Sequence, residues 1–157
     1  MKTLIDHLAQ YAAYHRDPRN IHTHFVGVPM IMFAVVVLLS RPVWWLGMVP
    51  VSPALACAVA AGIFYLRLYV RLGLVMSALL AAMLVGATAM APLGTTAWPA
   101  WGLGLFAVGW VIQFVGHYFE GRKPAFVDDV MGLLVGPLFV VAEWGFALGL
   151  RAEVQHA

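Results

Sequence analysis

The end of one long apolar run carries residues whose types and spacing suit metal chemistry. Four of them recur at intervals of three, four and three residues: Trp110, Gln113, His117 and Glu120. This spacing places them on one face of a helix. An imidazole and a carboxylate three residues apart can bind one metal ion, as the Glu-x-x-His pairs of di-iron helix bundles do. The alternative is a polar helix end, with Glu120 paired to Arg122 or Lys123.

Three more histidines lie near the start of the first apolar run: His15, His22 and His24. His22 and His24 diverge by about 200° on a helix, so we expect only one of them to serve a site. Neutral imidazoles with a carboxylate and open coordination positions suit Fe(II) or Zn. The only cysteine, Cys57, lies in an apolar run, which argues against a thiolate site. For each histidine the alternative is an interfacial side chain with a polar tip.

The composition indicates a membrane protein. Of the 157 residues, 63% are hydrophobic and 10% are charged, whereas a soluble domain has about 25% charged residues. Apolar runs of about 20 residues cross a bilayer as helices, because lipid leaves no other partner for the backbone polar groups. We predict an all-α polytopic transmembrane bundle of about five spans, near residues 21–40, 53–70, 73–93, 98–119 and 129–150.

Residues 1–20 precede the first span and predict an amphipathic interfacial helix. Apolar residues repeat at helical spacing from Thr3 to Tyr14, and Pro18 ends the pattern. One stripe of this helix holds Leu4, Leu8, Tyr11 and His15. His15 is therefore expected to point at the protein or the membrane. No linker or repeat divides the chain, so residues 1–157 are expected to form a single integral membrane domain.

The basic residues predict the orientation of the spans. Seven of the nine lie on one side: Lys2, Arg16, Arg19, Arg67, Arg71, Arg122 and Lys123. Arg41 and Arg151 lie on the other side. Cytoplasmic loops collect Lys and Arg, so the N-terminus and the candidate site are expected at the cytoplasmic face. The predicted outer boundary carries Trp44, Trp45, Trp98 and Trp101, as the aromatic belts of membrane proteins do.

Two polar sequence blocks, far apart in the chain, resemble the signatures of a known family. The first is Tyr14-His15-Arg16-Asp17-Pro18-Arg19-Asn20, followed by His24 and Pro29. The second is Trp110-Val-Ile-Gln113-Phe-Val-Gly116-His117, then Glu120-Gly-Arg-Lys-Pro124-Ala125. Together with the apolar layout between them, these blocks resemble the Mpo-type 2-hydroxy fatty acid dioxygenases over most of the chain.

The resemblance implies an Fe(II)-dependent membrane enzyme of fatty acid α-oxidation. Such an enzyme uses O2 to convert a 2-hydroxy long-chain fatty acid into an acid one carbon shorter. The essential histidines of the family carry over to His15, His24 and His117 as Fe2+ ligands, and His22 falls outside the pattern. Glu120 is expected to complete or orient the catalytic site. Residues expected to bind the substrate or orient the ligands are Asn20, Arg19, Arg122, Lys123 and Gln113.

Two other classes of function remain open on the residues alone. One is a small transporter or lipid-binding protein whose histidines handle protons or headgroups, and the other is a zinc-dependent membrane hydrolase. The predicted outer half has almost no polar residue besides Glu143, which counts against a transport path. Dependence on O2 and Fe(II) separates the dioxygenase from the hydrolase.

The sequence also bears on partners and location. No Lys/Arg patch interleaved with aromatic residues is present, so nucleic acid is not an expected partner, and a homo-oligomer stays open. The expected membrane is the cytoplasmic membrane in a bacterium or the endoplasmic reticulum in a eukaryote. Asp128 and Asp129 are expected to solvate or cap the start of the last helix.

Overall fold

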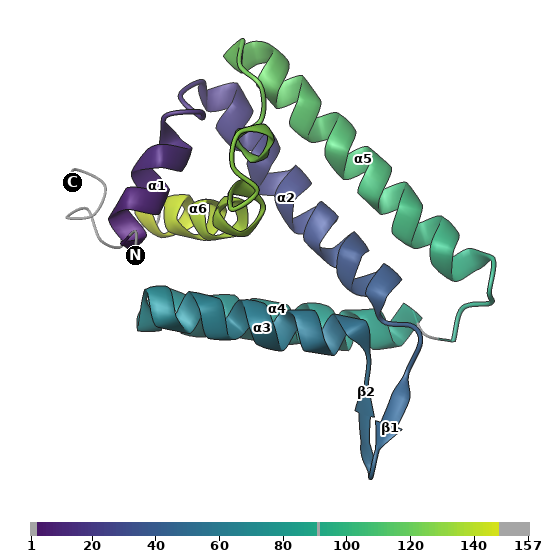
Figure 1. Ribbon diagram of the computed structural model, residues 1–157. Helices are drawn as coiled ribbons and strands as arrows, with labels where there is room; N and C mark the ends of the chain where they lie inside the picture. The colour runs from purple at the N-terminus through teal and green to yellow at the C-terminus, as the bar shows by residue number, and fades with distance from the viewer. Residues whose placement is uncertain (1–2, 91, 148–157) are drawn as a thin grey trace. The chain divides into compact units, whose positions relative to one another are not determined.

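The computed structural model describes residues 3–90 and 92–147, without the side chains of residues 126, 146 and 147. Six helices lie in this part of the chain (Figure 1): α1 (Leu4–Ala12), α2 (Pro18–Leu39), α3 (Pro53–Leu68), α4 (Val70–Met90), α5 (Ala97–Glu120) and α6 (Gly132–Ala147). The remaining elements are a short hairpin of β1 (Trp44–Leu46) and β2 (Val49–Val51), and the 3₁₀ turn η1 (Ala125–Val127). The predicted all-α class is confirmed. The end of the fifth predicted span, together with Lys2 and Arg151, lies outside the described residues.

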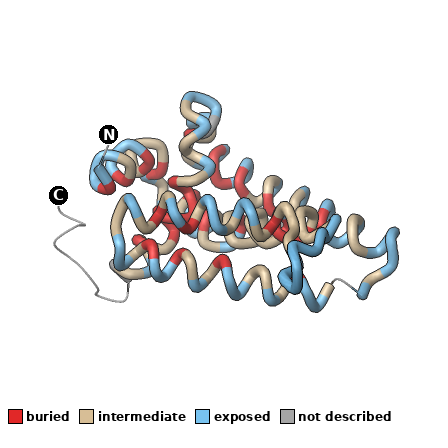
Figure 2. The backbone as a smooth tube through the Cα atoms, turned by 60° about the horizontal axis from the view of Figure 1, so that its bottom comes forward, coloured by how far each residue is buried: buried red, intermediate tan, exposed pale blue. Residues whose placement is uncertain are grey.

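Among the described residues, three helices are long and apolar enough to cross a membrane: α2, α4 and α5. In the most apolar 18-residue stretch of each helix, only 22% to 28% of the residues are buried (Figure 2). Apolar surface of this extent needs an apolar surrounding, so the chain is an integral membrane protein. The predicted count of five spans is not shown, because α3 and α6 have 16 residues each and fall below the usual spanning length.

The N-terminal helix is shorter than predicted and packs against protein. The Thr3 side chain and the Asp6 carboxylate form a reciprocal capping box at its start. Its last turn tightens, since the Tyr14 amide bonds to the Tyr11 carbonyl rather than continuing the α-helical pattern. The prediction that the helix reaches Tyr14 is wrong by two residues. Its buried face packs on α6, where a side chain at Gly136 would meet the Tyr11 hydroxyl.

The described chain forms two compact units. The first unit comprises the chain up to Pro29 and from Val111 onward, and so holds α1, the start of α2, the end of α5, η1 and α6. The second unit, residues 30–110, holds the rest of α2 and α5, the hairpin, α3 and α4. The prediction of a single domain stays a prediction.

Two local features fix the geometry of these units. In the second unit, α3 and α4 form a tight antiparallel pair joined at Tyr69, and Gly73 approaches the backbone of Leu66. In the first unit, the Asp129 carboxylate accepts a hydrogen bond from the Met131 amide just before α6. This contact agrees with the capping role expected for Asp129.

Candidate metal centre

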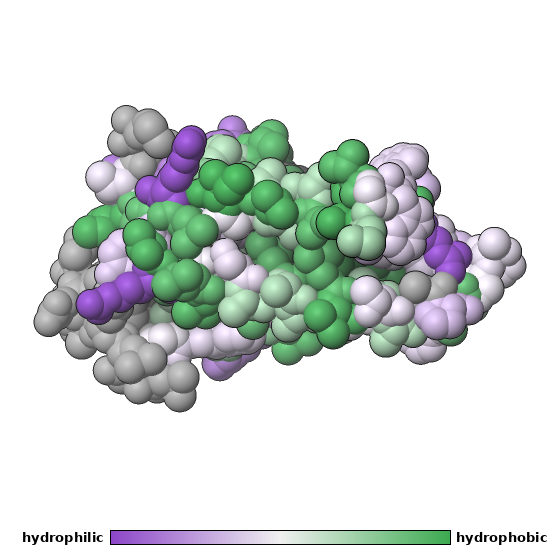
Figure 3. Space-filling model, turned by 90° about the horizontal axis from the view of Figure 1, so that it is seen from below, coloured by the Kyte–Doolittle hydropathy of each residue, from purple (hydrophilic) through white to green (hydrophobic). Residues whose placement is uncertain are grey.

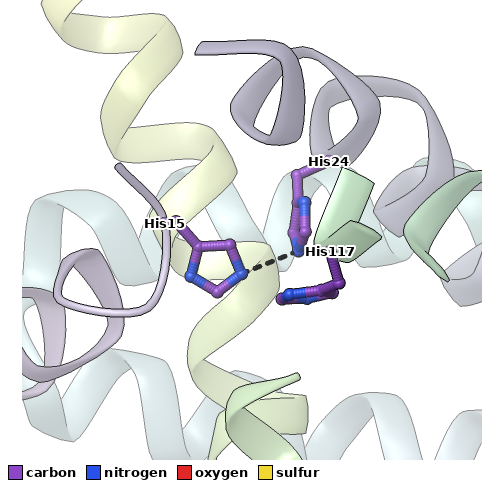
Figure 4. A group of neighbouring side chains, drawn as sticks. All are labelled: His15, His24 and His117. Atoms are coloured by element: carbon purple, nitrogen blue, oxygen red, sulfur yellow. Dashed lines mark hydrogen bonds between the residues drawn. The ribbon is translucent and has the colours of Figure 1, made fainter. Parts of the chain in front are cut away.

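Three histidines from three segments converge in the first unit (Figure 4). His15 lies in the linker after α1, His24 lies in α2 and His117 lies in α5. Their side chains are 3%, 2% and 7% exposed, respectively. One ring nitrogen from each lies within 4.8 Å of the others. His22 is exposed instead and its ring contacts Phe25, so only one histidine of the pair joins the cluster.

Backbone carbonyls fix the orientation of two of the rings. Nδ1 of His15 lies 2.8 Å from the Tyr11 carbonyl oxygen, and Nδ1 of His24 lies 2.9 Å from the Asn20 carbonyl oxygen. A carbonyl oxygen only accepts hydrogen bonds, so each Nδ1 carries the proton and donates it. Each neutral ring then presents a lone pair at Nε2, which is the state that binds metal.

The two Nε2 atoms of His15 and His24 face each other at 3.0 Å. With both lone pairs directed inward, the pair is favourable only with a cation or a shared proton between the two atoms. Nδ1 of His117 is buried and has no hydrogen-bond partner among the described residues. The cluster thus offers one ring nitrogen from each of three histidines and contains no carboxylate. This set of ligands fits a divalent transition metal such as Fe(II) or Zn.

Aromatic side chains cover the cluster. The Tyr11 ring stacks on His15 with ring centroids 4.2 Å apart, and Phe139 of α6 lies 5.7 Å from the same imidazole. Burial lowers the pKa of His15 to about 4, because the charged ring loses its hydration. His15 is therefore neutral at pH 7 and able to act as a ligand.

Glu120 binds the chain segment that carries His15 and does not join the histidine cluster. Its carboxylate accepts hydrogen bonds from the backbone amides of Arg16 and Asp17, each at 2.9 Å, and from Nδ2 of Asn20 at 3.1 Å. These donors surround the first turn of α2. A carboxylate is favoured there because the N-terminal amides of a helix are unpaired and carry partial positive charge.

The five residues expected to bind substrate divide into two groups. Asn20 and Gln113 are buried at 0% and 4% exposure. Their Oδ1 and Nε2 atoms, respectively, have no hydrogen-bond partner among the described residues. The other three, Arg19, Arg122 and Lys123, are exposed.

Each of the exposed cations already contacts the protein. Arg19 pairs with Asp17 and its guanidinium lies 4.4 Å from the centre of the Phe119 ring. Arg122 donates to the Ala13 carbonyl at 2.9 Å, and Lys123 pairs with Asp128. Asp128 thus serves an ion pair rather than a helix cap.

Sequence reasoning missed two residues that shape the cluster. Tyr11 supplies both the stacked ring and the carbonyl that orients His15; its place on the apolar stripe of the first helix was the available signal. Gly116 lies where α2 and α5 touch, and a Cβ there would approach Oγ1 of Thr23 to 2.0 Å. Nothing in the sequence around Gly116 and His117 indicates that α2 comes close to α5 at this point.

Comparison with known proteins shows which family this sequence resembles. Residues 1–148 match a family model described as 2-hydroxy-palmitic acid dioxygenase Mpo1-like. The chain is also 35% identical, over 155 residues, to the 2-hydroxy-palmitic acid dioxygenase MPO1 of Saccharomyces cerevisiae. That alignment covers 95% of this chain and 86% of the yeast protein. No solved structure matches the chain.

Proposed function

The chain belongs to the Mpo1-like family of 2-hydroxy-palmitic acid dioxygenases, and we propose that it shortens 2-hydroxy long-chain fatty acids by one carbon with O2. The observation that carries this proposal is the buried cluster of His15, His24 and His117. The reaction balances without another reductant: the hydroxy acid and O2 yield the shorter acid, CO2 and water. It is a step of fatty acid α-oxidation.

The three clustered histidines would hold Fe(II) through neutral imidazoles. When bound there, Fe(II) supplies redox chemistry with O2 and open coordination positions for oxygen ligands. The protein supplies orientation and exclusion of water. The carbonyls of Tyr11 and Asn20 hold two of the rings, and Phe139 and Tyr11 cover the cluster with apolar surface.

Glu120 would act as a positioning residue in this site. Its hydrogen bonds to the amides of Arg16 and Asp17 connect the end of α5 to the linker that carries His15. Charge-assisted bonds of this kind contribute roughly 1.5–3 kcal/mol each. His117 lies three residues before Glu120 in α5. Glu120 thereby holds the linker so that His15 stays beside His117.

The buried amide side chains and the exposed cations would have different roles in binding the substrate. Asn20 and Gln113 offer buried polar atoms that match the carboxyl and hydroxyl oxygens of a 2-hydroxy acid. Arg19, Arg122 and Lys123 are exposed at the same end of the unit, and any of them would pair with the fatty acid carboxylate on leaving its present partner. We place this end at the cytoplasmic face, from the distribution of basic residues.

The proposal is tested by product analysis of the purified protein in detergent micelles. With 2-hydroxypalmitate, O2 and Fe(II), we expect the saturated acid one carbon shorter, formed in step with O2 consumption. Palmitate lacks the 2-hydroxyl and serves as the control, which should give no product. Product formed equally under nitrogen would contradict a dioxygenase, because O2 would then not be the oxidant of the reaction.

A further inference from the structure

The hairpin of β1 and β2 exposes an apolar surface in the second unit. Its strands pair antiparallel, with Trp44 opposite Val51 and Leu46 opposite Val49. At the tip, Trp45, Leu46 and Met48 are 70%, 76% and 95% exposed. Exposed apolar residues gathered in this way mark a surface that meets another apolar phase or a partner.

The hairpin belongs to a long uncharged stretch of the sequence. No charged residue occurs between Arg41 and Arg67, a stretch that includes both strands and nearly all of α3. The exposed residues Val59 and Ile63 continue the apolar surface along α3. Apolar side chains make up much of the face on which α3 and α4 lie (Figure 3). The hairpin is thus continuous with the exposed apolar surface of α3.

With α4 spanning the bilayer, the shorter helix α3 beside it would bring the hairpin to the edge of the bilayer. The two helices are joined at Tyr69, and α4 has 21 residues against 16 in α3. Their far ends therefore differ by five residues (21 − 16). At 1.5 Å per residue, α3 is about 24 Å long, less than the bilayer core of about 30 Å. The hairpin precedes the short end of α3.

The direction of the hairpin agrees with this placement. In Figure 1 the hairpin extends to the side of α3 and α4, across their axes rather than along them. A segment that lies across the end of a spanning helix runs along the membrane surface instead of projecting into water. Apolar side chains on such a segment fill the space that a short helix leaves near the interface.

Contacts at the base of the hairpin mark the same level. The Arg41 guanidinium lies 5.1 Å from the centre of the Trp98 ring and donates to the Leu93 carbonyl at 2.9 Å. The Trp98 indole donates to the Val37 carbonyl at 2.8 Å. An arginine held against a tryptophan at the ends of apolar helices is typical of the headgroup region.

We propose that the hairpin Trp44–Val51 is a membrane anchor immersed in the boundary between lipid headgroups and acyl chains. Trp44 and Trp45 suit this depth because an indole has an apolar body and a polar N–H. Leu46 and Met48 at the tip enter the acyl region. The occupant of the exposed surface is bilayer lipid, which distinguishes the proposal from a contact with a second copy of the chain.

Site-directed spin labelling tests the anchor, because the sequence contains one cysteine to replace. In a Cys57→Ser background, a nitroxide is attached at Met48→Cys, at Val59→Cys as the lipid reference, or at Thr95→Cys as the aqueous reference. Val59 is 53% exposed on α3, and Thr95 is exposed in the loop between α4 and α5. The protein is reconstituted into phosphatidylcholine–phosphatidylglycerol vesicles. Collision rates are measured with O2, which partitions into lipid, and with a water-soluble nickel chelate.

We expect the Met48 label to resemble the Val59 label, with a ratio of O2 to nickel collisions several-fold above that of the Thr95 label. A ratio equal to that at Thr95 would place the hairpin in water and overturn the proposal. A label shielded from both reagents would show protein contact, from a second copy or elsewhere, and would overturn it as well. Unchanged far-ultraviolet circular dichroism of each labelled protein confirms that the helices are retained.

Discussion

The clustered histidines are held by contacts that decide what the rings can do. His15 and His24 donate from Nδ1 to carbonyl oxygens, so both present Nε2 to the centre of the cluster. The sequence could predict these two histidines and His117 through the family signatures. Helical spacing alone could not choose between His22 and His24, because the choice depends on which face of α2 meets α5.

The burial of His15 predicts a pH-dependent stability of the metal-free protein. Its pKa in the folded state is about 4, below the usual 6.5, so the unfolded chain takes up the proton first as the pH falls. The stabilisation that neutral His15 provides is fully present above pH 6.5 and is lost progressively towards pH 4. This group lowers the free energy of unfolding over that range by up to about 3 kcal/mol. Thermal unfolding followed by circular dichroism in detergent measures the loss.

A His15→Gln variant is the control for this pH dependence. Its unfolding temperature should fall less between pH 6.5 and pH 4 than that of the wild type, because one group that resists protonation has been removed. Parallel curves for the two proteins would show that His15 does not cause the effect.

Removal of the Glu120 carboxylate should weaken metal binding without removing a ligand. In Glu120→Ala the amides of Arg16 and Asp17 lose their acceptor, and the linker that carries His15 becomes free to move. We expect metal affinity to fall about 10- to 100-fold, the usual effect of losing a residue that orients a ligand. Competition with a chelator of known affinity measures the change.

Lys123→Ala is the matched control for Glu120→Ala. Lys123 is a charged neighbour that pairs with Asp128 rather than with the linker, and its loss should leave the affinity unchanged. If Glu120→Ala binds metal as tightly as the wild type, contacts other than those to Glu120 fix the position of the linker and of His15.

At the scale of elements, the site depends on a close contact between α2 and α5. A Cβ at Gly116 would lie 2.0 Å from Oγ1 of Thr23 and 2.5 Å from Oδ1 of Asn20. Only a residue without a side chain allows His24 and His117 to approach across this contact. The sequence predicts both helices and places them near their observed bounds, but their mutual approach depends on tertiary packing that no periodicity records.

The Gly116→Ala substitution should therefore destabilise the protein and disperse the histidines. The added methyl group must displace Thr23 or separate the helices, and overpacking of this kind costs about 1–3 kcal/mol. We expect a lower unfolding temperature together with loss of bound metal. Gly104→Ala, on the same helix with open space around the added Cβ, should leave both properties unchanged. Normal metal binding by Gly116→Ala would contradict the contact.

The linker between α1 and α2 shows another limit of local patterns. Helical spacing predicted His15 as part of the first helix, whereas α1 ends at Ala12 and His15 lies beyond a tight turn. Pro18, which was expected only to end the first helix, begins α2, where its fixed φ suits the first helical position. The apolar stripe still predicted the correct outcome for His15, which points into protein.

For the whole molecule, composition predicted the membrane class correctly, but the number of spans is not determined by apolar length alone. The helices α3 and α6 are apolar yet have 16 residues each. Charge distribution adds an orientation that can be measured. Because α5 is long enough to cross the membrane, the loop before it and the loop after it should lie on opposite sides.

Cysteine labelling tests this orientation in right-side-out membrane vesicles. In a Cys57→Ser background, a membrane-impermeant maleimide should label Thr95→Cys, which precedes α5, and should label Lys123→Cys only after the vesicles are opened. Both positions are exposed, so unequal reactivity reports the side of the membrane. The reverse pattern would place the histidine cluster at the outer face.

The central claim is that the buried histidines form the metal centre of this dioxygenase, and the most direct measurement is the metal content of protein purified anaerobically in detergent. We expect about one iron per chain in the wild type and in His22→Ala, whose exposed ring lies outside the cluster. His24→Ala should contain almost none, with its circular dichroism unchanged. Iron retained in a folded His24→Ala protein would contradict the claim, and stoichiometric zinc in the wild type would contradict the assignment of the metal.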